Sequence, residues 1–231
     1  RKAGWDEMFE ERAWTGAIDE HILTIMEEVG QVERSLVLDC GCGATGPVSP
    51  RLFRDLGCSP VTLNANPDGR FPGRPSEPTE ANLKDLMSLC KAKGVPGIAH
   101  DGDGDRMVAV DEDGRYVSGD RLLALFASLL QVKDMAAPVD ASMVLDDIVG
   151  RPIVRTKVGD MFVSEALKKK GLPFGGEPSG TFIFPSVNYC PDGMLAGAYL
   201  LKLLDGRPLK EVVSSLPVYP SVRDSFSFDP S

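Results

Sequence analysis

Residues 95–110 read VPGIAHDGDGDRMVAV, an acidic loop between two short apolar runs. The runs are rich in Val, Ile and Ala, so we expect a strand on either side of the loop. Within the loop, Asp101, Asp103 and Asp105 alternate with glycine, and the bare backbone lets their carboxylates converge. Carboxylates this close repel one another unless a hard cation neutralises them, so the pattern predicts a magnesium site.

The acidic loop has two other interpretations. A solvated acidic turn is the simpler one, because Gly and Asp are common turn residues. A calcium loop of the EF-hand kind would place Glu112 at its twelfth position. That loop needs glycine at its sixth position, where this sequence has Arg106, and a strand-like run follows where further ligands should be. We therefore reject the EF-hand.

The composition indicates a globular protein without a membrane helix. The chain has 231 residues, of which 42% are hydrophobic and 26% are charged, enough for one large or two ordinary domains. No stretch approaches the ~18 uninterrupted apolar residues of a membrane span, and the first residues lack the apolar segment of a secretory signal. We expect a cytoplasmic protein with no membrane partner.

The net charge and the cysteines limit the partners and metal sites that the protein can have. A net charge of −9 argues against a nucleic-acid partner, because phosphate contacts need a basic face, but it is compatible with a small anionic substrate at a metal site. The five scattered cysteines favour reduced thiols over disulfides. Cys40 and Cys42 lack a second pair or a nearby histidine, so buried or loop thiols are preferred over a soft-metal site.

Helical and strand-like patterns alternate along the chain in two series. Apolar residues recur at helical spacing over 17–29, and the run at 36–38 is typical of a buried strand. A second series of the same kind begins near Ser118. We expect two consecutive mixed-sheet α/β domains. Their predicted bounds are a connector at 1–16, domains at 17–117 and 118–218, and the start of a linker at 219–231.

Three further predictions concern individual segments of the chain. Thr79 is expected to cap a helix that runs to about Lys93. Residues 172–174 are predicted to be a strand and residues 175–180 a loop. The Pro- and Gly-rich stretch 64–78 is too long for a simple connector, and loops of this size often carry function.

A glycine motif offers a competing function. Residues 36–46, LVLDCGCGATG, fit G-x-G-x-x-G after a strand and before a helix, a pattern found at dinucleotide and S-adenosylmethionine sites. Such a site normally has an acidic residue at the end of the next strand to bind the ribose hydroxyls, and this sequence has Asn64 there. We prefer a structural tight turn with close helix packing, and a methyltransferase is kept as the alternative that would explain this motif alone.

Several motifs together resemble one family. Asp101–Arg106, Lys157–Asp160 and Gly176–Gly180 occur in this order between predicted elements, and 39–47 and 66–72 fit the same pattern. Jointly they resemble the α-D-phosphohexomutases, which interconvert 1- and 6-phosphosugars, over essentially the whole chain. The resemblance implies that this chain contains the second and third of four α/β domains.

The resemblance also implies roles for individual residues. Asp101, Asp103 and Asp105 match the magnesium loop of the family, and Arg106 matches the loop arginine that reaches the active site. A non-catalytic metal-binding module remains an alternative, and it would explain these acids alone.

The other matching positions belong to substrate recognition. Glu177 and Ser179 match the sugar-recognition loop, where a carboxylate and a hydroxyl can share hydrogen bonds with sugar hydroxyls. Lys157 matches a basic residue near the substrate, a candidate for phosphate binding or proton transfer. The simpler interpretations are a salt-bridged Lys157, a solvent-facing Glu177 and an Arg106 that only pairs with the acids.

The sequence departs from the family pattern in three places. Thr181 stands where many members have histidine. Neither the Thr-Ala-Ser-His-Asn-Pro type segment of the catalytic phosphoserine nor the Arg-x-Ser-Gly-Thr type phosphate loop occurs in the sequence. We therefore expect these residues alone to be inactive in phosphoryl transfer.

The resemblance implies a magnesium-dependent enzyme that transfers a phosphoryl group within a hexose or hexosamine phosphate, from the 1- to the 6-position or back. It leans toward the phosphoglucosamine mutases, with phosphomannomutase/phosphoglucomutase as the alternative. The expected partners are a phosphosugar substrate and a sugar bisphosphate intermediate, and the oligomeric state stays open.

Overall fold

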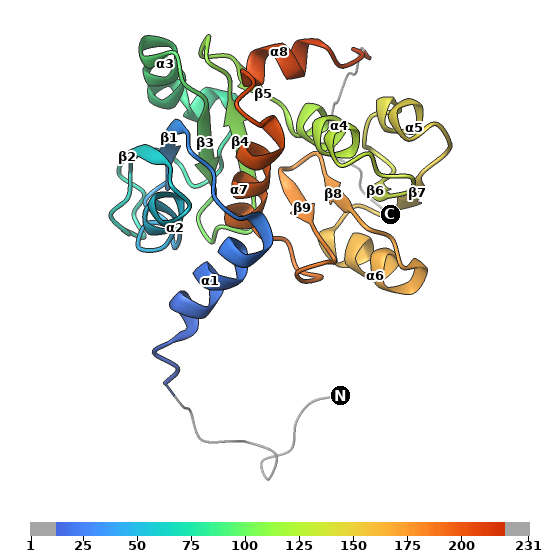
Figure 1. Cartoon of the computed structure of the whole chain (residues 1–231), viewed down its shortest axis with the longest axis horizontal. Coiled ribbons are helices and arrows are strands. Elements are labelled where there is room, and N and C mark those ends of the chain that lie inside the picture. Colours follow the sequence, from blue (N-terminus) through green and yellow to red (C-terminus); the bar gives the residue numbers. More distant parts are fainter. Residues whose placement is uncertain (1–12, 220–231) are drawn as a thin grey trace, which may run out of the picture.

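The structure, a computed structural model, describes residues 13–219 and contains two α/β domains, which confirms the predicted fold class (Figure 1). The first eight elements in chain order are α1 (Ala17–Val29), β1 (Ser35–Asp39), α2 (Ser49–Asp55), β2 (Ser59–Leu63), the 3-10 turn η2 (Glu80–Asn82), α3 (Lys84–Lys93), β3 (Gly97–His100) and β4 (Met107–Val110). They are followed by β5 (Tyr116–Val117), α4 (Gly119–Leu129), β6 (Ala136–Pro138), α5 (Val144–Val149), β7 (Val154–Thr156), α6 (Asp160–Lys170), β8 (Gly175–Glu177), β9 (Thr181–Ile183), α7 (Gly193–Leu204) and α8 (Leu209–Ser214).

The first sheet has the order β2-β1-β3-β4-β5. The strands β2, β1 and β3 are parallel, whereas β4 and β5 are antiparallel additions at one edge. Val37 at the centre of β1 lies between Val61 and Gly97 in the register. The acidic loop joins β3 to β4, so it lies at the carboxyl end of the central parallel strands, where α/β sheets commonly place their sites.

Alternation along β1 assigns its side chains to two different cores. Leu36 and Leu38 face the large central core, and Val37 faces a smaller outer core together with Leu86 and Cys90 of α3. Side chains of a strand point to opposite faces in turn, so a fully apolar strand must be covered on both sides. The helix α3 provides that cover on the outer face.

The second sheet repeats this plan with the order β7-β6-β8-β9, of which only β9 is antiparallel. Its outer face is covered by Val163 and Leu167 of α6. On its inner face Phe182 packs against Phe126 of α4, with ring centroids 4.9 Å apart. Such tilted ring pairs are favourable because the edge of one ring meets the face of the other.

Two helices lie between the sheets and join them into one body. The helix α4 contacts β4 and β8, and α7 contacts β3, β4 and β9 (Figure 1). Their buried residues belong to the same central core as both sheets. The two sheets lie at 35–117 and 136–183, and the exact bounds of the two domains stay a prediction.

Some local predictions were wrong. The helix expected from Thr79 begins only at Lys84, after the separate turn η2, and the Thr79 side chain makes no capping bond. Residues 172–174 are not a strand, because β8 begins at Gly175. The helix α8 was not predicted. Apart from 13–16 and 219, the expected connector and linker lie outside the described residues.

Two properties of the described residues bear on the sequence analysis. Within 13–219, no helix is long and apolar enough to cross a membrane. All five cysteines are free thiols, and only Cys190 is exposed. Burial raises the pKa of the Cys40 and Cys90 thiols to about 12, which favours the neutral form and makes these side chains unreactive.

Candidate functional site

The three acids of the loop between β3 and β4 converge. One carboxylate oxygen from each of Asp101, Asp103 and Asp105 can be chosen so that all three lie within 4.8 Å of one another. Asp101 is buried, Asp105 is half-buried and Asp103 is exposed, so the cluster is open to solvent on one side. Asp101 Oδ1 accepts the backbone N–H of Gly104 at 3.0 Å, which folds the loop back on itself.

The electrostatics of this cluster fit a hard cation. Burial, a side-chain hydrogen bond with Asp101 and the negative charges of Asp101 and Asp103 raise the pKa of Asp105 to about 7. Its Oδ1 atom is buried and accepts no hydrogen bond within the described residues. Its ion pair with Arg106 Nε, at 3.5 Å, is long. A buried carboxylate oxygen without a hydrogen bond is costly, and an oxygen-seeking divalent cation would satisfy it. The residues present therefore fit a magnesium or manganese ion.

The glycine motif supports the acidic loop from behind. A Cβ atom on Gly43 would lie 2.4 Å from Gly102 O and 3.0 Å from Asp101 O, so only glycine fits. Ala44 N donates to Gly102 O at 2.9 Å. The other N–H groups of this turn bind Cys40 O, Asn64 O and the Asp39 carboxylate rather than pointing into a cavity. This is the structural tight turn that the sequence favoured, but its contact with the acidic loop was not foreseen.

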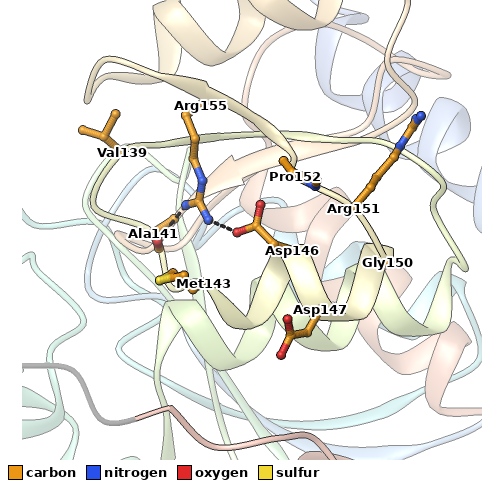
Figure 2. Close-up of a pocket in the computed structure, with 9 residues that line it drawn as sticks. All are labelled: Val139, Ala141, Met143, Asp146, Asp147, Gly150, Arg151, Pro152 and Arg155. Carbon is orange, nitrogen blue, oxygen red and sulfur yellow. Dashed lines mark hydrogen bonds and ion pairs between the residues drawn. The ribbon is translucent and has the colours of Figure 1, made fainter.

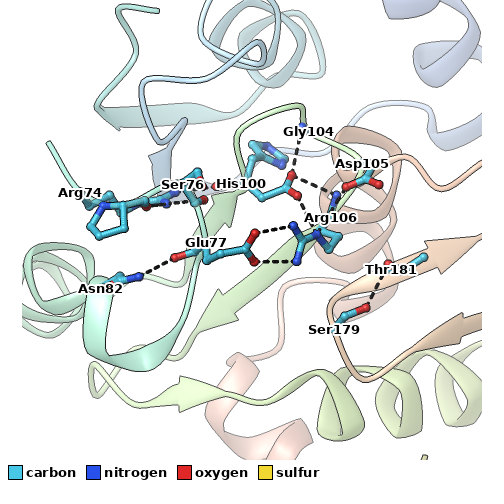
Figure 3. Close-up of polar contacts among 12 residues, drawn as sticks. Arg74, Ser76, Glu77, Asn82, His100, Gly104, Asp105, Arg106, Ser179 and Thr181 are labelled. Atoms are coloured by element: carbon cyan, nitrogen blue, oxygen red, sulfur yellow. Dashed lines mark hydrogen bonds and ion pairs between the residues drawn. The ribbon is translucent and has the colours of Figure 1, made fainter. Parts of the chain in front are cut away.

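Arg106 ends the acidic loop and pairs with the carboxylates of Glu77, Asp101 and Asp105 (Figure 3). Its Nη1 and Nη2 atoms donate to the two carboxylate oxygens of Glu77 at 2.6 and 2.8 Å, and its Nε donates to Asp101 Oδ2 at 2.6 Å. Glu77 was not singled out from the sequence. The available signal was its place at the end of the long loop 64–78, because loops of that length often carry function.

A buried ion pair fixes that long loop. Arg74 is 6% exposed, and its Nε donates to Asp39 Oδ2 at 3.0 Å. Its other nitrogens donate to the carbonyls of Pro75, Ser76 and His100. One side chain thus joins the end of β1, the loop that carries Glu77 and the residue before Asp101. Neither partner of this pair was predicted, because a buried arginine cannot be told from a surface one by sequence.

His100 anchors the start of the acidic loop inside the core. Its side chain is fully buried, and its Nε2 lies 2.9 Å from Ser49 Oγ at the start of α2. Its Nδ1 has no hydrogen-bond partner within the described residues. Burial lowers the pKa of His100 to about 4, so the ring is neutral at physiological pH.

The second domain meets the acidic loop through its main chain. Met107 N donates to Gly180 O at 2.9 Å, and Arg106 and Thr181 form an isolated antiparallel bridge. Ser179 Oγ lies 3.1 Å from Oγ1 of Thr181, the residue that bridges to Arg106 (Figure 3). Of the two predicted sugar-recognition residues, Ser179 is therefore brought next to the acidic loop.

The prediction of a loop around Glu177 was wrong, because this residue ends the strand β8 and is 8% exposed. Its Oε1 accepts the backbone N–H of Gly159 at 2.6 Å. Burial raises the pKa of Glu177, and the hydrogen bond from Gly159 opposes this rise. The solvent-facing interpretation of Glu177 is also wrong. The misassignment arose because three glycines and a proline mask the short strand.

Lys157 follows β7 and is exposed. Its Nζ lies 5.6 Å from the ring centroid of Phe162, a cation–π contact, and it forms no salt bridge within the described residues. Lys157 lies two residues before Gly159, whose N–H binds Glu177. Within the described residues, its side chain has no contact with the acidic loop. The structure thus brings together the three aspartates, Arg106 and Ser179 more closely than it does Lys157.

A cavity of about 740 Å³ lies elsewhere, between α5 and the edge strand β7 (Figure 2). Its most prominent cation, Arg155, donates to Ala141 O at 2.7 Å and also binds the Asp146 carboxylate. The remaining lining includes the exposed side chains of Val139 and Met143. Arg151 also lines the cavity and pairs with Asp134 at 2.7 Å. Because both arginines already have carboxylate partners, we do not include this cavity in the site.

Comparison with known protein families identifies both domains. Residues 15–114 match Phosphoglucomutase/phosphomannomutase, alpha/beta/alpha domain II, and residues 118–219 match alpha/beta/alpha domain III of the same family. A curated relative, named probable phosphoglucosamine mutase, from Methanocella arvoryzae is 46% identical over 233 residues. This alignment covers 99% of the present chain and 53% of the relative. The chain thus spans about half the length of the curated relatives it matches.

Solved structures give the same result. A phosphoglucomutase/phosphomannomutase family protein from Burkholderia thailandensis superposes with a TM-score of 0.83 at 32% identity, over 90% of this chain and 48% of that one. The N-acetylphosphoglucosamine mutase of Aspergillus fumigatus, in complex with GlcNAc-6P and magnesium, shares the fold at 19% identity. Its TM-score is 0.62, over 88% of this chain and 49% of that one.

Proposed function

The chain belongs to the phosphoglucomutase/phosphomannomutase family, and on that basis we propose that its two domains hold a divalent cation and bind the sugar in a phosphohexomutase reaction. The whole reaction is the transfer of a phosphoryl group between the 1- and 6-positions of a sugar phosphate. The relative at 46% identity supports this assignment at the level of the family's chemistry.

Asp101, Asp103 and Asp105 would hold the cation, as magnesium or manganese. Their support is the convergence of three carboxylates and the buried, unsatisfied Oδ1 of Asp105. A divalent cation at this place neutralises charge on a phosphoryl group in transfer. The glycine turn around Gly43 holds the loop in this shape, so the three acids remain together although they repel one another.

Glu177 and Ser179 would bind the hydroxyls of the sugar, and Lys157 would attract its phosphate. The Glu177 carboxylate uses one oxygen for Gly159 N, which leaves its other oxygen to accept from a sugar hydroxyl. Its fixed position reduces the entropy that would be lost on binding. The Lys157 ammonium is exposed, so a charged substrate can reach it from solvent.

One observation carries the proposal. The hydrogen bond from Met107 N to Gly180 O places the acidic loop of one domain against the Ser179 loop of the other. A non-catalytic metal-binding module would not require this contact. A methyltransferase site is disfavoured because the N–H groups of Gly41, Cys42, Gly43 and Ala44 are already paired.

The finer parts of the proposal concern the substrate. We favour a glucosamine phosphate because the curated relatives with 46% and 42% identity are named probable phosphoglucosamine mutases. Phosphomannomutase/phosphoglucomutase activity is the alternative. A sugar bisphosphate intermediate, a cytoplasmic location and the inactivity of these 231 residues alone stay predictions.

The test is phosphosugar binding by the chain itself, measured by isothermal titration calorimetry with magnesium. We expect glucosamine 6-phosphate to bind more tightly than glucose 6-phosphate or mannose 6-phosphate. Ser179→Ala should weaken binding, whereas Ser128→Ala, an exposed serine on α4, should leave it unchanged. Equal binding by Ser179→Ala and the parent chain, or no binding of any phosphosugar, would contradict the proposed site.

A further inference from the structure

Arg106 reaches outward from the acidic loop, and its two terminal nitrogens are both used by one partner. Nη1 and Nη2 bind the carboxylate of Glu77 at 2.6 and 2.8 Å, as Figure 3 shows. A bidentate pair of this kind fixes the plane of the guanidinium as well as its position. Only Nε faces the acids, at 2.6 Å from Asp101 Oδ2.

Glu77 is 53% exposed at its side chain, yet its main chain is held firmly. The buried Arg74 donates to the carbonyls of Pro75 and Ser76, directly before Glu77, and to His100 O, directly before Asp101. The Glu77 carbonyl also accepts from Asn82 Nδ2 at 2.9 Å. Arg74 therefore joins the loop that carries Glu77 to the start of the acidic loop.

The guanidinium has an alternative partner close by. Arg106 Nε already forms a long ion pair, at 3.5 Å, with Asp105 Oδ1, a buried oxygen that accepts no hydrogen bond within the described residues. If Glu77 released the terminal nitrogens, they would need new acceptors, and this oxygen, already beside Nε, has no hydrogen bond. A guanidinium there would neutralise the acids and cover a ligand oxygen, so it would compete with a divalent cation.

We propose that Glu77 is a positioning residue that keeps the two terminal nitrogens of Arg106 away from Asp105 and so keeps the acidic loop available to a divalent cation. This inference rests on the cation site of the proposed function. It assigns a task to the long loop 64–78, which the sequence marked as functional without a role. Glu77 acts through Arg106 and is not itself a ligand of the ion.

The test is a manganese titration of the 231-residue chain, in which electron paramagnetic resonance measures the concentration of free ion. Glu77→Gln should weaken binding about tenfold, because the freed arginine then occupies the acids. Glu80→Gln removes an exposed charge three residues further along the chain and should weaken binding less than about twofold. In an Arg106→Gln background, Glu77→Gln should cost no more than Glu80→Gln does.

Two outcomes would overturn the role of Glu77. One is an equal loss for Glu77→Gln and Glu80→Gln, which would reduce Glu77 to a charge at a distance. The other is an undiminished loss in the Arg106→Gln background, which would exclude an effect through Arg106. Unfolding of each variant in EDTA checks that the fold is kept.

Asp103→Asn in the same series separates this inference from the proposed function. If manganese binds the parent and depends on Asp103 but not on Glu77, only the positioning role fails. If binding does not depend on Asp103, or the parent binds no manganese, the cation site fails and the inference falls with it.

Discussion

Met107 N donates a hydrogen bond to Gly180 O at 2.9 Å, and this contact joins the acidic loop of the first domain to the Ser179 loop of the second. Both residues are held by their own sheets, Met107 at the start of β4 and Gly180 just before β9. The relative position of the two loops is therefore set by rigid elements, which is what a shared substrate site requires.

We expect Glu177→Gln and Glu177→Ala to differ in stability but to agree in function. Glutamine can still accept from Gly159 N, so its free energy of unfolding should stay near that of the parent. Alanine leaves the partly buried N–H of Gly159 without its acceptor and should cost about 1 kcal/mol in urea unfolding. Both should lose phosphosugar binding in calorimetry, because both remove the carboxylate. Parent-like binding by either variant would exclude Glu177 from the site.

The packing of the glycine turn predicts a contrast between two alanine variants. Gly43→Ala places a methyl group 2.4 Å from Gly102 O, so the backbone must shift, and we expect it to lower the free energy of unfolding by about 1–3 kcal/mol. It should also weaken manganese binding. Gly69→Ala has no atom within 4 Å of its new methyl group and should be neutral or slightly stabilising. Similar unfolding curves for the two variants would contradict the packing.

His100 predicts a loss of stability at acidic pH. Its pKa is lowered by burial from 6.5 to about 4, so below pH 6.5 the unfolded chain takes up a proton that the folded chain cannot. Stability is therefore lost as the pH falls from about 6.5 toward 4. His100→Gln removes the titrating group, and its unfolding free energy should decline less steeply over this range. Parallel curves for variant and parent would show that His100 does not titrate as described.

The fold was predictable where a pattern repeats, and less so where it depends on distant partners. The alternating burial of Leu36, Val37 and Leu38 follows from an apolar strand covered on both faces. The strand β8, in contrast, reads Gly-Gly-Glu and has no apolar signal of its own. It is held by its neighbours β6 and β9, which the sequence does not reveal.

The residues of the site also differ in how far the sequence predicts them. The three aspartates are close in the sequence, so their convergence needed only a flexible backbone. Glu77 and Arg74 contact residues 29 and 26 positions away, and such pairings depend on the packing of the whole sheet. Lys157, singled out by resemblance, lies apart from the acids, and its role in phosphate binding rests on the proposed function.

Binding of a divalent cation to the acidic loop is the central claim, and a manganese titration of the parent chain beside Asp103→Asn and Asp113→Asn tests it most directly. Asp113 lies in the turn between β4 and β5 and pairs with Lys210 at 2.9 Å, so it serves as a control acid outside the cluster. We expect one manganese ion per chain, displaced by magnesium, with at least about tenfold weaker binding in Asp103→Asn and unchanged binding in Asp113→Asn. Equal binding by all three proteins would contradict the claim.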